Sequence, residues 1–313
     1  MGALACRMFS LIEHGLRASI PTPWRAALYM VGACFVWSFL AWVVRDLSRD
    51  LHAFEIVFFR NLFGFAAIAP FLFRHGIPAF PRREIGIYLI RGAFGLVAML
   101  GWFYAITVVP LAEATALSFT APIFATVTAI VLLGEVVRVR RWTAMLVGFA
   151  GAMIVLRPGE LAIGIGEIAV LVSSAAIAVV MVMVKILART ETSDRIVAFH
   201  TLILLPLSLL AAVFVWTWPT WPQLGLCVAL GAAASLANWL TVRAFTLSDT
   251  AAIMPYDFTR LPFMALVGYF AFAEVPDAWT WIGGAVIFAS SLYIARREAQ
   301  LARARSAAGD RES

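Results

Sequence analysis

Long apolar runs separated by short polar connections dominate the pattern along this chain. Each run has roughly the 20 residues that an α-helix needs to cross the hydrocarbon core of a bilayer. The runs are continuous rather than alternating, and a helix satisfies its own backbone groups in lipid, so barrel strands do not fit. The pattern predicts an all-α integral membrane protein with ten transmembrane helices, at residues 26–44, 54–73, 85–106, 112–133, 142–156, 166–187, 196–217, 224–246, 251–273 and 279–295.

Composition and the placement of positive charge agree with this prediction. Hydrophobic residues make up 63% of the 313 residues and charged residues only 13%, whereas soluble domains are about 45–50% apolar. Among the basic residues of the loops, only Arg45, Arg49 and Arg157 fall on the side predicted to be outside. The positive-inside rule therefore places both termini in the cytoplasm, and the net charge of +6 reports topology rather than nucleic-acid binding.

Polar segments flank the ten runs. Residues 1–25 are predicted to form a cytoplasmic leader, in which Arg7, Glu13 and Arg17 interrupt any apolar stretch that could be a cleavable signal. Residues 296–313 are predicted to form a cytoplasmic tail.

The two halves of the chain repeat at a shift of 139 or 140 residues. The matching pairs, first copy before second, are Arg45 and Lys185, Arg60 and His200, Glu135 and Glu274, and Trp142 and Trp281. A five-helix unit is therefore predicted to occur twice, at residues 26–157 and 158–295. An odd number of spans makes the second copy enter the membrane from the opposite side. Such inverted repeats are typical of secondary transporters that work by alternating access.

Four arginines lie inside apolar spans: Arg60, Arg91, Arg243 and Arg260. A charged side chain at mid-bilayer costs about 2.5–3.5 kcal/mol on insertion scales, so we expect the four to face a polar interior. Arginine forks bind carboxylates bidentately, which makes Arg60 and Arg91 candidates for substrate binding. The alternatives are a salt bridge to Glu55 or Glu113, or a side chain that reaches the interface, as for Arg243 near its helix end.

Asp257 precedes Arg260 by three residues on the same predicted helix face, so the two charges can neutralise each other. Pro255 and Pro262 flank the pair, which predicts either a simple kink or a break that turns free carbonyl groups toward a ligand. Asp257 and His200 are also the candidates inside the spans for coupling transport to protons.

Glu135 and Glu274 close equivalent spans, which indicates a shared structural task rather than substrate contact. Capping of a helix, or an ion pair such as one with Arg138 in the first half, would fulfil that task. Small residues at helical spacing, from Gly148 to Ala152 and from Gly231 to Ser235, predict close helix packing.

Three segments, at residues 101–135, 148–159 and 244–274, resemble the EamA repeats of the drug/metabolite transporter superfamily. Shorter segments, at residues 51–60, 89–92 and 243–256, are similar to parts of S-adenosylmethionine uptake carriers and, more loosely, of riboflavin carriers. The resemblance implies ten helices in two inverted EamA units, a bacterial inner-membrane location, no bound cofactor and transport of a small metabolite.

The third, fourth, eighth and ninth spans line the cavity in the family that this chain resembles. Aromatic rings on these spans could stack on a planar substrate while hydroxyl and amide groups fix its orientation. The alternative for each aromatic residue is interface anchoring or core packing. The candidates are Trp102, Tyr104, Thr115, Ser118, Asn238, Trp239 and Tyr256.

The motifs of metalloproteases, redox CxxC proteins, P-loop ATPases and serine hydrolases do not occur in the chain, so neither an enzyme nor an ATP-driven pump is predicted. The predicted function is secondary transport of a small polar metabolite that bears carboxylate or zwitterionic groups. The alternatives are export of amphipathic drugs or cations, riboflavin uptake and, more remotely, a membrane-embedded enzyme. The predicted partners are the metabolite and the lipid bilayer, with no metal and no nucleic acid, and a homodimer is compatible with the sequence.

Overall fold

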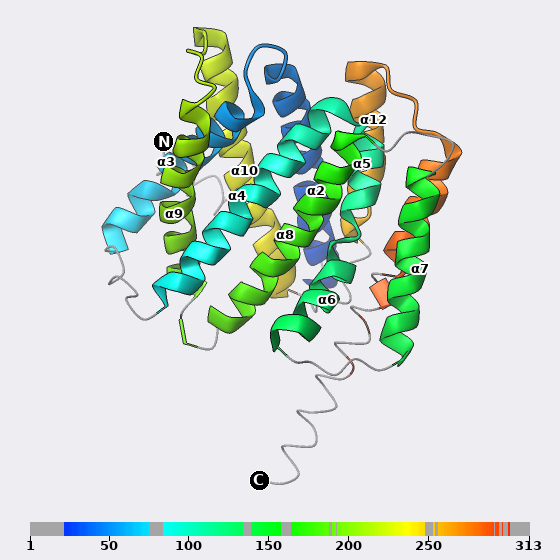
Figure 1. Cartoon of the computed structure of the whole chain (residues 1–313). Coiled ribbons are helices and arrows are strands. Elements are labelled where there is room, and N and C mark those ends of the chain that lie inside the picture. Colours follow the sequence, from blue (N-terminus) through cyan, green and yellow to red (C-terminus); the bar gives the residue numbers. More distant parts are fainter. Residues whose placement is uncertain are drawn as a thin grey trace, which may run out of the picture.

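The computed structural model describes residues 22–75, 84–133, 139–157, 164–187, 190–191, 193–247, 253, 256–290, 292–293, 296 and 300. Within these residues all regular structure is helical, as predicted (Figure 1). The helices are α2 (Thr22–Leu47), α3 (Ala53–His75), α4 (Ile85–Val108), α5 (Leu111–Ser118), α6 (Ala121–Leu133), α7 (Val139–Leu156), α8 (Ile165–Leu187), α9 (Ser193–Val213), α10 (Trp221–Leu247), α12 (Arg260–Phe272) and a final helix at Ala278–Ser290.

Five helical segments are long and apolar enough to cross a membrane by length and composition alone. They are α2, α4, the stretch Leu111–Leu132 that combines α5 with most of α6, α8 and α10. Shorter apolar helices lie in α7, α9, α12 and the final helix. Together with α3, these segments account for the ten predicted crossings. The leader up to residue 21, most of the tail, Glu135, Arg138 and Pro255 lie outside the described residues.

Two spans differ from the prediction. The fourth span is interrupted by a turn at Phe119 and Thr120, which separates α5 from α6. The seventh span was predicted to reach Thr217, but α9 ends at Val213. The reason is tertiary, because the backbone N–H of Thr217 donates to the carboxylate of Glu55 at 2.6 Å instead of continuing the helix.

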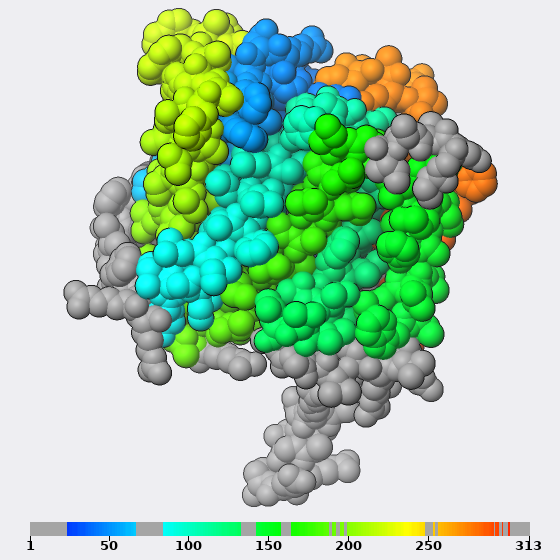
Figure 2. All heavy atoms as spheres, viewed as in Figure 1, coloured from blue at the N-terminus to red at the C-terminus, as the bar shows by residue number. Residues whose placement is uncertain are grey.

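The core lies where α2, α3, α4, α5, α10 and α12 meet. Its fully buried members include Val44, Ile56, Ile106, Leu117 and Leu261. Two long helix pairs frame it, since α2 packs along α10 and α4 packs along α8 (Figure 1). Bulky apolar side chains also cover the outside, as expected for contact with lipid rather than water. Phe35 is 60% exposed and Phe149 is 57% exposed, and α4, α8 and α7 form much of the face seen in Figure 2.

Glycines allow the closest helix contacts, as the small-residue spacing predicts. A Cβ atom on Gly231 of α10 would lie 2.8 Å from the backbone nitrogen of Gly64 on α3. A Cβ atom on Gly151 of α7 would lie 2.9 Å from the backbone nitrogen of Ile287 in the final helix. These backbones therefore pack without a side chain between them.

Candidate functional site

Three basic side chains form a column beside one face of α4, which we call the nitrogen column: Arg60 of α3, His200 of α9 and Arg91 of α4. The Nη1 atom of Arg60 lies 3.2 Å from the sulfur of Met99. The ring of His200 packs on Gly95, where an added Cβ would meet its Cε1 atom at 3.0 Å. Positions 91, 95 and 99 are one helical turn apart, so the column extends over about 12 Å along α4.

The hydrogen-bonding groups of the nitrogen column are only partly used. Arg91 is 7% exposed and donates to the backbone oxygen of Ile196 at 3.4 Å. Arg60 donates to the side-chain oxygen of Asn61 at 3.2 Å. The buried Nε atoms of both arginines and the buried Nδ1 of His200 have no hydrogen-bond partner. Among the described residues, no carboxylate forms an ion pair with either arginine.

The acids that the sequence offers as counter-charges are used elsewhere. Glu55 is fully buried and accepts hydrogen bonds from the backbone of His52 at 3.0 Å and from Thr217. Its role is to hold the start of α3 to the segment after α9, so the suggested salt bridge to an arginine is wrong for Glu55. Glu113, in the first turn of α5, has Arg157 rather than the nitrogen column as its basic electrostatic neighbour.

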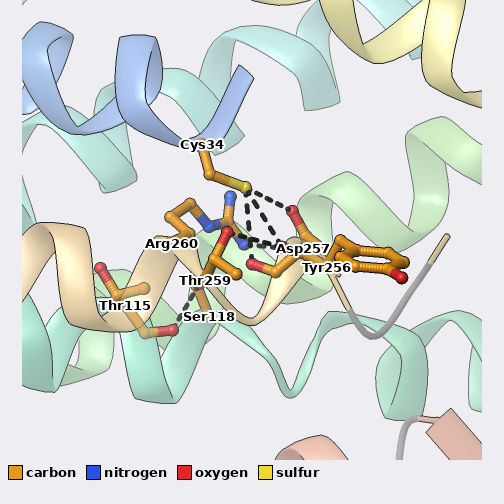
Figure 3. Close-up of polar contacts among 7 residues, drawn as sticks. All are labelled: Cys34, Thr115, Ser118, Tyr256, Asp257, Thr259 and Arg260. Carbon is orange, nitrogen blue, oxygen red and sulfur yellow. Dashed lines mark hydrogen bonds and ion pairs between the residues drawn. The ribbon is translucent and has the colours of Figure 1, made fainter. Parts of the chain in front are cut away.

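A second polar cluster lies at the start of α12, next to α2 and α5 (Figure 3). Asp257 and Arg260 form an ion pair at 3.5 Å, and Arg260 also lies over the ring of Phe119, 5.3 Å from its centroid. The sulfur of Cys34 on α2 lies 3.7 Å from both the carboxylate and the backbone oxygen of Asp257, and 3.8 Å from the backbone oxygen of Tyr256. The predicted pairing of Asp257 with Arg260 is therefore confirmed. The chain turns at Phe258 and the residue after it, which agrees with a break rather than a simple kink, while the freeing of carbonyl groups toward a ligand stays a prediction.

Thr115 and Ser118 project from α5 near this cluster, but both hydroxyl groups donate within their own helix. Thr115 donates to the backbone oxygen of Leu111 at 2.7 Å, and Ser118 donates to that of Thr115 at 2.7 Å. Their oxygen lone pairs can still accept hydrogen bonds. Their assignment to substrate binding stays a prediction.

The remaining candidates have packing contacts of their own. Trp102 and Tyr104 pack against the main core. Trp239 and Tyr256 belong to a smaller apolar cluster at the start of α2, where Trp239 meets Tyr29 edge to face at 5.8 Å. Arg243 lies over Trp239, 5.6 Å from the ring centroid. Asn238 is exposed.

Glu274 has the structural role that the sequence predicts. Ala273 ends α12 in the left-handed conformation, with φ 54°, which turns the next residue back over the helix end. Glu274 then accepts the backbone N–H of Leu111, at the first turn of α5, at 2.9 Å and pairs with Arg45 of α2. One carboxylate therefore joins the ends of α2, α5 and α12. The expected capping and pairing role is confirmed for Glu274.

The known proteins that are similar in sequence to this chain are transporters. The EamA-like transporter family matches residues 24–157. An S-adenosylmethionine uptake transporter of Rickettsia felis is 29% identical, covering 79% of this chain and 84% of that protein. A riboflavin transporter of Rhizobium johnstonii is 31% identical, covering 87% of this chain and 91% of the relative. A pseudopaline exporter of Pseudomonas aeruginosa is 29% identical over 86% of this chain and 95% of its own length.

A solved crystal structure has the same fold, with a TM-score of 0.58 and 20% identity over 87% of this chain and 98% of that chain. The likeness to these transporters covers 79–87% of this chain and 84–95% of the relatives, and five helices are long and apolar enough to cross a membrane. On this basis the chain belongs to the EamA-like transporter family of the drug/metabolite transporter superfamily.

Proposed function

We propose that this protein is a secondary transporter that moves a small polar metabolite, with a carboxylate or zwitterionic group, across the bacterial inner membrane by alternating access. In this proposal two inverted five-helix copies, with both termini in the cytoplasm, enclose the path. The observation that carries the proposal is the nitrogen column, in which two arginines and a histidine place unpartnered buried nitrogen atoms beside one helix face.

The argument from the nitrogen column is one of charge. A guanidinium group stays protonated in proteins, and a buried charge without a counter-ion costs several kcal/mol or more. Since no described carboxylate pairs with Arg60 or Arg91, an anionic group of the substrate is the natural counter-ion. Arginine matches a carboxylate with two parallel hydrogen bonds, which supplies orientation as well as affinity.

The relatives named for S-adenosylmethionine uptake support the same chemistry. S-adenosylmethionine combines an amino-acid carboxylate with cationic groups, so we propose that the nitrogen column takes the carboxylate of such a substrate and Asp257 faces its cationic part. Riboflavin has no carboxylate and would leave both guanidinium groups uncompensated. An S-adenosylmethionine-like or amino-acid-derived substrate is therefore proposed ahead of riboflavin. Partly buried rings such as Trp102 and Tyr104 stay candidates for stacking on its planar part.

Proton coupling, if it operates, is proposed to use Asp257 or His200. Asp257 is held by Arg260, while His200 lies within electrostatic range of both Arg60 and Arg91. Uptake in proteoliposomes, measured with and without an imposed pH gradient, separates coupled transport from exchange. If Asp257→Asn and His200→Gln both leave that gradient dependence unchanged, neither residue is the coupling group.

Arg60→Gln and Arg91→Gln test the function directly. The substrate is first selected by thermal-shift screening of the purified protein against S-adenosylmethionine, riboflavin and amino-acid-derived carboxylates. Hydrogen bonds to charged groups contribute about 1.5–3 kcal/mol, so each substitution should reduce transport about 10- to 100-fold.

Arg49→Gln is the matched control, because Arg49 is exposed on the connection after α2 and pairs only locally with Asp46 at 3.6 Å. Competition by compounds that bear a carboxylate is expected, but not by cations that lack one, whereas the reverse order would favour export of amphipathic cations. Normal flux in both Arg60→Gln and Arg91→Gln, at wild-type protein levels, would refute the assignment of the nitrogen column.

A further inference from the structure

Two helix interruptions in this protein carry the same dipeptide. Phe119 and Thr120 form the turn between α5 and α6, and Phe258 and Thr259 form the turn before α12. The two dipeptides are 139 positions apart, which is the shift that also places Glu135 on Glu274. The sequence repeat therefore extends to the place where each copy breaks a helix.

The two interruptions are also built in the same way. The hydroxyl group of Thr120 donates to the backbone oxygen of Leu117 at 2.7 Å, and that of Thr259 donates to the backbone oxygen of Tyr256 at 2.7 Å. The backbone N–H groups of the same threonines donate to the same oxygens, at 3.0 Å and 3.1 Å. Each threonine thus closes a tight turn with both of its donors, and the helix resumes after it.

The two interruptions touch each other. The rings of Phe119 and Phe258 lie 5.5 Å apart between centroids, with 32° between their planes. When two copies are related by a two-fold axis, equivalent atoms lie on opposite sides of that axis at equal distances. Each ring centroid would therefore lie no further from the axis than half of this 5.5 Å separation.

The helices around this contact pack in pairs that agree with a two-fold axis. Exchange of the two copies turns α2 into α8 and α10 into α4, and the pairs α2 with α10 and α4 with α8 are the two long pairs of the fold (Figure 1). The helices α5 and α12, which border the two interruptions, are also in contact with each other.

We infer that the contact between Phe119 and Phe258 lies on the pseudo-two-fold axis and is the pivot of the transport cycle. The two interrupted helices rock about this point. Their halves on the side predicted to be outside, α5 and α12, which we call the outer halves, separate when their halves on the cytoplasmic side approach each other. In this structure the outer halves are held together by the hydrogen bond from Leu111 to Glu274. This inference rests on the alternating access of the proposed function, but not on the identity of the substrate.

Paired cysteines test the pivot. In a background with Cys6→Ala, Cys34→Ser and Cys227→Ala, one variant carries Phe119→Cys with Phe258→Cys. A second variant carries Pro110→Cys with Val275→Cys, which are exposed neighbours of Leu111 and Glu274 and leave the hydrogen bond between those two residues in place. Each is cross-linked with a short bis-methanethiosulfonate reagent, and transport in proteoliposomes is compared before linking, after linking and after reduction. The pivot pair should link and keep its transport. The outer pair should link, lose transport and regain it on reduction.

Loss of transport on linking the pivot pair, restored by reduction, would overturn the inference, because a pivot keeps its length through the cycle. Failure of that pair to link would overturn it as well, because the two positions would then not be in contact. If the unlinked pivot pair does not transport, its linking yield is measured with and without the selected substrate. The yield of the pivot pair should stay the same while that of the outer pair changes, and a yield at the pivot that changes with substrate would overturn the inference. Absence of transport in the wild-type protein would instead count against the proposed function.

Discussion

Replacement of Glu274 should destabilise the protein through its ion pair with Arg45. The two side chains are only 14% and 17% exposed, and Arg45 also lies over the ring of Phe272, 4.8 Å from the centroid. Removal of one partner from a buried pair costs about 3–5 kcal/mol, and the residual exposure here argues for the lower end, about 3 kcal/mol. Glu274→Ala additionally removes the acceptor for the backbone N–H of Leu111, which leaves a helix N-terminus uncapped.

A double-mutant cycle isolates the pair from these other losses. Arg45→Met keeps an apolar stem over Phe272, and Glu274→Gln keeps the shape of the carboxylate. Stability of the detergent-solubilised variants is measured by unfolding, and the coupling free energy between the two substitutions should be about 1–3 kcal/mol.

The exposed pair of Arg49 and Asp46 is the internal control for this cycle. Its side chains are 66% and 36% exposed, and a solvated pair of this kind should show a coupling of about 0–1 kcal/mol. A coupling between positions 45 and 274 no larger than this control would show that Glu274 does not join α2 to α12 through charge.

Two further predictions concern the same assay. Gly225→Ala should keep or raise the melting temperature, because nothing lies within 4 Å of an added Cβ and alanine favours a helix over glycine by about 1 kcal/mol. Gly231→Ala in the same helix should lower the melting temperature, because its Cβ would meet the backbone of Phe63 at 2.8 Å. Burial alone would raise the pKa of Asp277, on the connection before the final helix, but the two hydrogen bonds from Thr280 and the charge of Arg157 outweigh it and lower that pKa. The charged form therefore stabilises the fold above the unfolded pKa of about 3.9, so Asp277→Asn should lower the melting temperature at neutral pH. The difference should shrink as the pH falls below about 4 and be lost as the pH falls through the lowered pKa of the folded state.

The positions of the spans follow from sequence because lipid imposes the same length and apolarity on every crossing. The helix break near Asp257 was also signalled, by flanking prolines. The break at Phe119 was not predicted, although Pro122 in the first turn of α6 is a signal for it, and the threonine whose hydroxyl bonds to its own backbone completes the turn. The early end of α9 depends on Glu55, which is distant in sequence from Thr217.

The candidate site was predictable where desolvation sets the direction of a side chain. The cost of a charge in lipid predicts that Arg60 and Arg91 turn inward, and their contacts with neighbouring helices agree. Their alignment with His200 was not predictable, because it depends on the helix register that Gly95 allows. The exposure of Asn238 was not predicted, because α10 is apolar on every side and its sequence does not show which face is buried.

The two copies agree in scaffold and differ in chemistry, and this difference bears on how a duplicated transporter binds one substrate. Phe119 matches Phe258, but Ser118 stands where the second copy has Asp257, and Ala121 stands where it has Arg260. A site with two-fold symmetry would bind a substrate equally well in two opposite orientations. A charge pair present in only one copy removes one of them. In the proposed cycle, symmetry at the pivot would let the copies exchange roles, while asymmetry beside it would fix which end of the substrate faces which half.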